Sequence, residues 1–179
     1  MDAIVVYESV YGNTREVAEA IADGVGAVAV LPVHEAHQRR ETVDLLIVGG
    51  PTHVHGLATK RSRHVAVETA TEDGRSHLQA GASTEPGLRE WLHDLTPRAA
   101  HHAAAFDTRL DKSPWISGAA GHGIAQRLRR LGIDVIATES FLVEDTEGPL
   151  EAGECERARA WGAELAQSLS ASRKDLVQT

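Results

Sequence analysis

Five short, nearly continuous apolar runs divide the chain. They occupy residues 3–7, 27–33, 43–49, 102–106 and 133–137. A strand exposed on one face alternates apolar and polar residues, whereas a strand covered on both faces reads as a continuous apolar run. The pattern therefore predicts five buried strands of a parallel sheet.

Amphipathic helical patterns separate these runs. Apolar residues recur at helical spacing in 14–24, 86–96, 119–131 and 151–169. The connection 34–42 is short and polar, so any helix there is expected to be brief. Strands that alternate with helices predict an α/β fold, a doubly wound five-stranded parallel sheet with helices on both faces.

The length of 179 residues is typical of one domain, which we expect to span 1–170. Residues 171–179 are polar and are expected to form a flexible tail. The segment 58–85 is much longer than ordinary strand–helix loops. It is either a tolerated surface insertion or a lid or docking loop beside a site.

Composition narrows the classes of function. The formal net charge of -8 argues against a general nucleic-acid binder and suits docking onto a basic protein surface. Cys155 is the single cysteine, so no internal disulfide forms. No apolar run approaches the length of a membrane span, and no leader precedes the first run. We expect a soluble, cytoplasmic protein without a membrane or nucleic-acid partner.

The turn after the first run, SVYGNT at 9–14, carries the candidate chemistry. Open parallel sheets bind ligands at the carboxyl ends of their strands, and this turn leads directly into a helix. Ser9, Thr14 and the Asn13 amide are donors, the first helical amides lack partners, and Gly12 permits close approach. The set predicts a phosphate seat. The alternative is that Asn13 or Thr14 only caps the helix.

Other phosphate motifs are incomplete in this turn. A Walker loop needs Gly-Lys-Ser/Thr, and no Lys is present; a dinucleotide fingerprint needs three glycines, and only Gly12 is present. A phosphate monoester held by neutral donors is therefore the best fit.

The octapeptide YESVYGNT at 7–14 resembles the phosphate loop of flavodoxins, whose usual pattern is Thr/Ser-x-Thr-Gly-x-Thr. The resemblance extends over about residues 1–170. It implies the flavodoxin-like strand order 2-1-3-4-5 and one bound FMN, its phosphate held by Ser9, Val10, Tyr11, Gly12, Asn13 and Thr14. Tyr11 departs from the usual Thr and donates either through its phenol or through its backbone only.

The resemblance also implies two loops around the flavin ring. The first, GGPTHVHGL at 49–57, supplies Pro51, Thr52, His53, Val54, His55 and Gly56. Its Gly-Pro-Thr opening is similar to the flavoprotein quinone-reductase branch of the fold. His53 stands where an aromatic residue usually stacks; the alternative is that both histidines are solvated.

The second ring loop, FDTRLDKSPWISG at 106–118, begins at the end of the fourth strand. By position, Asp107, Thr108 and Arg109 reach the pyrimidine edge of the flavin. Trp115 either covers the other face of the ring or packs under the next helix.

The resemblance implies a redox protein that transfers electrons to or from a partner protein or a small quinone-type acceptor. One alternative is an NAD(P)H-dependent FMN reductase acting on quinones. Another is a flavodoxin-like fold that has lost its flavin and serves as a binding module. No side chain is assigned as catalytic, no metal is expected because the ten histidines form no clear three-ligand set, and an oligomer is left open.

Overall fold

A computed structural model describes residues 1–36, 42–53, 56–57, 87–111 and 120–177. Several sequence predictions concern other parts of the chain. Those for Val54, His55, Trp115, the whole 58–85 insertion and the last two residues of the tail lie outside the described residues.

The sheet is parallel throughout its main path and has the order β2-β1-β3-β5-β6. This is the predicted order 2-1-3-4-5, so the fold prediction is confirmed. A short β4 pairs antiparallel with the end of β3. The strands are β1 (Ala3–Tyr7), β2 (Ala29–Pro32), β3 (Val43–His53), β4 (Gly56–Leu57), β5 (Ala100–Leu110) and β6 (Asp134–Val143).

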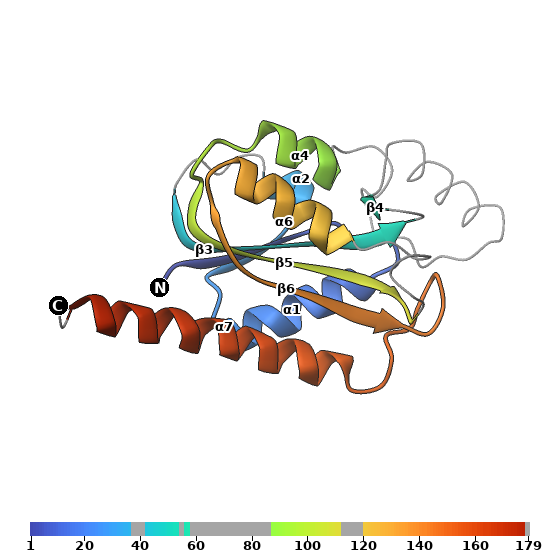
Figure 1. Ribbon diagram of the computed structural model, residues 1–179. Coiled ribbons are helices and arrows are strands. Elements are labelled where there is room, and N and C mark those ends of the chain that lie inside the picture. The colour runs from blue at the N-terminus through green and yellow to red at the C-terminus, as the bar shows by residue number, and fades with distance from the viewer. Residues whose placement is uncertain (37–41, 54–55, 58–86, 112–119, 178–179) are drawn as a thin grey trace.

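Helices cover both faces of the sheet (Figure 1). One face carries α1 (Asn13–Val25) and α7 (Glu154–Val177), and the other carries α2 (Val33–Ala36), α4 (Leu88–Asp94) and α6 (Ala120–Arg130). The helix α2 is a single turn, as the polar connection led us to expect. The helix α7 runs to Val177, beyond its predicted end at 169.

Two apolar layers flank the sheet. On the α4 and α6 side, Trp91, Leu92 and Leu128 pack against strand residues. On the α1 and α7 side, Phe141 lies between Phe106 and Trp161, with ring-centroid distances of 6.2 and 6.1 Å in edge-to-face geometry. The continuous apolar runs are therefore buried on both sides, which is the physical reason the strands were recognisable.

Glycine residues allow the helices α1 and α7 to pack closely against each other. A Cβ atom on Gly24 would lie 2.0 Å from the carbonyl oxygen of Arg159, and one on Gly162 would lie 2.3 Å from that of Ile21. The helix α1 continues past Gly24. The C-cap is Gly26, with φ 68°.

The strands β3, β5 and β6 are longer than predicted. Strand β3 continues to His53 because its end pairs with both β5 and β4, and β5 continues to Leu110 because it pairs with β6 as far as Val143. Both ring loops were predicted to begin earlier. Those predictions were wrong at the start of each loop, since residues 49–53 and 107–110 are strand.

Candidate functional site

The candidate site lies at the carboxyl ends of β1, β3 and β5, where α1 begins (Figure 1). The chain leaves β1 on one side toward β2, and β3 pairs on its other side, so the strand order reverses here. A crevice at such a reversal is the usual ligand site of an open α/β sheet. The turn 9–14 is therefore placed where the sequence predicted it.

The turn presents backbone amides to this crevice. Gly12 occupies the N-cap position of α1 with φ 100°, and nothing lies within 4 Å of the place where its Cβ would be. The Gly12 N–H donates to Ser9 Oγ at 3.1 Å. Within the described ranges, no side-chain hydrogen bond caps the start of α1, which leaves the amides of its first turn open. Together with the helix dipole, these amides suit an anion.

The side chains of the turn differ in accessibility. Val10 is buried, so its side chain is not accessible from the crevice. Tyr11 is half-buried, and burial followed by the nearby charge of Glu147 raises the pKa of its phenol. The phenol therefore stays protonated at neutral pH and remains a hydrogen-bond donor.

Two predicted phosphate donors are already engaged within the protein. The Asn13 side-chain amide donates to the carbonyl oxygen of Glu147 at 3.0 Å, which ties the turn to the connection between β6 and α7. Thr14 Oγ1 lies 2.8 Å from Thr108 Oγ1. The sequence offered no signal for either contact, because the partners are far apart along the chain.

The ring-loop residues that the structure describes mainly support helix α6. Thr52 Oγ1 accepts a hydrogen bond from the amide of Ala120 at 3.1 Å, and Asp107 Oδ2 accepts one from the amide of Gly121 at 2.8 Å. Asp107 is 0 % exposed, and its Oδ1 has no hydrogen-bond partner among the described residues. These two side chains therefore act as N-caps of α6.

The structure describes only some of the remaining residues that were predicted to lie around the flavin ring. The backbone of His53 ends β3 and pairs with Gly56 in a short hairpin, while the side chain of His53 lies outside the described set. Pro51 pairs in register with Thr108. The structure therefore places Pro51, near the end of β3, beside β5.

Two further residues, Glu8 and Cys155, lie in surroundings that indicate what their side chains do. Glu8 is buried and its Oε2 accepts a hydrogen bond from the amide of Leu88 at 2.9 Å, so it caps the start of α4. Burial, then the charges of Glu16 and Glu156, raise the pKa of the Cys155 thiol, which keeps it in the weakly reactive protonated form. Among the described residues, no three His, Cys, Asp or Glu side chains gather as metal ligands.

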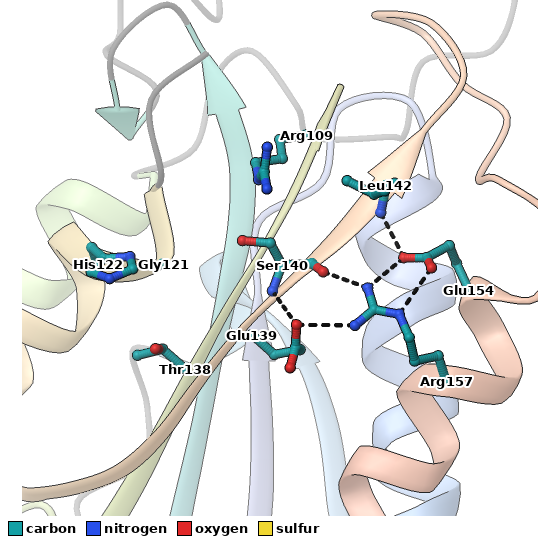
Figure 2. Close-up of a pocket in the computed structure, with 9 residues that line it drawn as sticks. All are labelled: Arg109, Gly121, His122, Thr138, Glu139, Ser140, Leu142, Glu154 and Arg157. Atoms are coloured by element: carbon teal, nitrogen blue, oxygen red, sulfur yellow. Dashed lines mark hydrogen bonds and ion pairs between the residues drawn. The ribbon is translucent and has the colours of Figure 1, made fainter. Parts of the chain in front are cut away.

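A separate pocket of about 450 Å³ opens along the free edge of β6, between α6 and α7 (Figure 2). Arg109 and His122 line it, and the sequence did not indicate it. Arg157, on α7, donates through Nη1 to Glu139 and through Nε to Glu154, at 3.0 and 2.9 Å. The single Arg157 guanidinium thus pairs with two carboxylates in the pocket wall.

The same side chains protect the edge of β6. Arg157 Nη2 donates to the carbonyl oxygen of Ser140, and the amide of Leu142 donates to Glu154 Oε2 at 2.7 Å. The Leu142 carbonyl accepts the amide of Glu151 at 3.0 Å. These bonds satisfy backbone groups that would otherwise be open to pairing with another chain.

Glu154 should make stability depend on pH. Burial alone would raise the pKa of Glu154, but hydrogen bonds from Arg157 and the Leu142 amide, with the Arg157 charge, lower it below its ordinary value. A lowered folded-state pKa contributes stability above the unfolded pKa, and this contribution is lost as the pH falls through the folded pKa. We expect Glu154→Gln to lower the free energy of unfolding by about 1 kcal/mol at pH 7.

The size of this effect reflects solvent screening, since the Arg157 side chain is 40 % exposed. The difference from wild type should shrink as the pH falls below about 5. Urea unfolding at several pH values measures it, with the exposed Glu144→Gln as the matched control. A difference that stays constant between pH 7 and pH 3 would show that the Glu154 charge contributes nothing.

No described helix is long and apolar enough to cross a membrane. In comparisons with known proteins, a family model described as "Flavodoxin domain" matches residues 4–84. No curated protein matches this chain in sequence.

Solved structures match over almost the whole chain. Oxidised flavodoxin 1 from Bacillus cereus has a TM-score of 0.59 at 16% identity, covering 93% of this chain and 98% of its own. A flavodoxin from the domain Archaea has a TM-score of 0.49 at 18% identity, covering 95% and 99%. The general stress protein 14 from Treponema denticola, solved in complex with FMN, has a TM-score of 0.47 at 11% identity, covering 94% and 99%. At such identities, the Bacillus cereus match establishes the fold alone.

Proposed function

Because residues 4–84 belong to the flavodoxin domain family and the chain has the flavodoxin-like α/β fold, we propose that this protein binds one FMN and transfers electrons. The observation that carries the proposal is the start of α1. There, Gly12 has φ 100° with open space beside it, and the first-turn amides have no side-chain cap among the described residues.

The residues present fit a phosphate monoester. The amides of the first turn of α1, the Ser9 hydroxyl and the protonated Tyr11 phenol are neutral donors within or next to the turn 9–14. A helix N-terminus adds partial positive charge, so a phosphate needs no cation there. When bound, FMN supplies the redox chemistry, and the protein supplies binding, orientation and access.

The partner that we propose is a redox protein or a small quinone-type acceptor. The formal net charge of -8 supports a partner with a basic docking surface. Mixing the protein with FMN, NADPH and a benzoquinone distinguishes an electron carrier from an NAD(P)H-dependent reductase. Rapid oxidation of NADPH would favour the reductase, and its absence would favour the carrier.

The first test is a titration of FMN with the purified protein, followed by flavin fluorescence. We expect quenching that saturates at one FMN per chain. Ser9→Ala should weaken binding by about tenfold or more, because it removes a hydroxyl donor to a charged group. Ser170→Ala, an exposed serine on α7, is the matched control and should bind as wild type does.

Full FMN fluorescence at every protein concentration would overturn this proposal. The flavin-free binding module would then be the better interpretation of the fold. Fold alone does not decide between the two, because function belongs to the site.

A further inference from the structure

A buried hydroxyl pair joins the phosphate seat to the sheet. Thr14 Oγ1, in the first turn of α1, lies 2.8 Å from Thr108 Oγ1, near the end of β5. The two residues are 2 % and 5 % exposed, and either oxygen can be the donor. Water has little access to this contact, so the energetic cost of leaving either hydroxyl unpaired is high.

The β5 side of the contact is held firmly. Thr108 pairs in register with Pro51 on β3 and with Phe141 on β6, and its neighbour Asp107 caps α6. The α1 side of the contact is the first turn of that helix. There, the Thr14 hydroxyl and the Asn13–Glu147 hydrogen bond link the first turn to other segments.

We propose that Thr108 is a positioning residue of the phosphate seat, acting through Thr14, and not a ligand of the pyrimidine edge. This inference rests on the proposed function. Thr108 fixes the first turn of α1 on a rigid strand, and with it the amides that face the phosphate. Holding donors in the bound geometry in advance removes part of the ordering cost of binding.

The chemistry of the two hydroxyls is compatible with this role, because the contact allows Thr108 to be the donor. A hydroxyl has one proton and two acceptor positions. When Thr108 donates to Thr14 Oγ1, the Thr14 hydroxyl proton stays available for another hydrogen bond. The hydrogen bond that Thr14 accepts also makes its hydroxyl a stronger donor. Valine at position 108 has nearly the same shape as threonine and cannot donate, so Thr108→Val removes this interaction with little change in packing volume.

The effect should concern the phosphate and not the ring. We expect Thr108→Val to weaken FMN binding by about tenfold, the equivalent of one hydrogen bond, and to leave the affinity for riboflavin, which lacks the phosphate, unchanged. Thr108→Ser keeps the hydroxyl and should restore FMN affinity. The exposed Thr138→Val, on β6, is the matched control and should bind both flavins as wild type does.

The experiment measures FMN and riboflavin dissociation constants for wild type and these variants by fluorescence quenching. An equal loss for both flavins, or no loss for either, would overturn the assignment of Thr108. If wild type binds riboflavin but shows no preference for FMN, the phosphate seat itself is wrong and this inference falls with it. If wild type binds neither, the proposed function has failed.

A second variant covers poor folding of Thr108→Val. Thr108→Cys retains a similar volume and a much weaker hydrogen-bonding group. It should show an intermediate, phosphate-dependent loss of FMN affinity. A Cys variant with wild-type preference for FMN over riboflavin would contradict the role of the hydroxyl pair.

Discussion

Gly162→Ala is expected to lower the free energy of unfolding by about 3 kcal/mol, although alanine is normally the better helix former. The added Cβ would lie 2.3 Å from the carbonyl oxygen of Ile21 and 3.0 Å from the amide nitrogen of Val25. Both atoms belong to the backbone of α1 and cannot rotate away. The helices would therefore have to separate, and the packing between α1 and α7 would be lost along its length.

The control for this substitution is Gly123→Ala, in α6. Nothing lies within 4 Å of the place where a Cβ on Gly123 would be, so only helix propensity should act. That variant should gain stability, by up to about 1 kcal/mol. Urea unfolding of wild type and the two variants measures the sign of each change in the free energy of unfolding. If the two substitutions shifted stability in the same direction, the close contact of α1 with α7 would be refuted.

Phe141→Ala should cost about 3–5 kcal/mol of unfolding free energy. The ring is 0 % exposed and makes edge-to-face contacts with Phe106 and Trp161. The Arg157 guanidinium lies 4.5 Å from the centroid of the Phe141 ring. The hydrogen bonds that Arg157 makes along the edge of β6 therefore also depend on this ring. Removing it leaves a cavity between the sheet and α7 that backbone packing on both sides prevents from closing.

Phe141→Leu separates the cavity from the aromatic contacts. Leucine fills most of the space, so its cost should stay below about 1.5 kcal/mol. Thermal and urea unfolding, with the fluorescence of Trp161 as a local probe, measure both variants. If Phe141→Ala and Phe141→Leu lowered the free energy of unfolding equally, tight packing around the ring would not contribute to stability, contrary to the structure.

The strands and helix faces were predictable because burial leaves a mark on each local segment. Residues 3–7 are apolar throughout, since β1 is covered on both faces. In 14–24, Val17, Ala18 and Ile21 recur at helical spacing, and all three are fully buried in the structure. The turn 9–14 was also recognisable, because the residue types that bind phosphate are adjacent in sequence.

Strand ends were less predictable, because pairing between distant segments decides them. Nothing within FDTRL shows that Asp107, Thr108 and Arg109 are strand rather than loop. That depends on their pairing with residues 140–142 of β6. The same holds for Gly24, which stops a helix in a local interpretation and allows α7 to approach in the folded chain.

By itself, the sequence determined the order of the elements, the parallel doubly wound sheet and the place of the turn 9–14 between β1 and α1, because each depends on residue types within short segments. Tertiary structure alone decided what the polar side chains at the site do. Thr52 and Asp107 cap α6, Asn13 holds the connection after β6, and Thr14 meets Thr108. A hydrogen bond depends on which donor and acceptor the folded chain brings within about 3 Å, and no local pattern of residues encodes that distance.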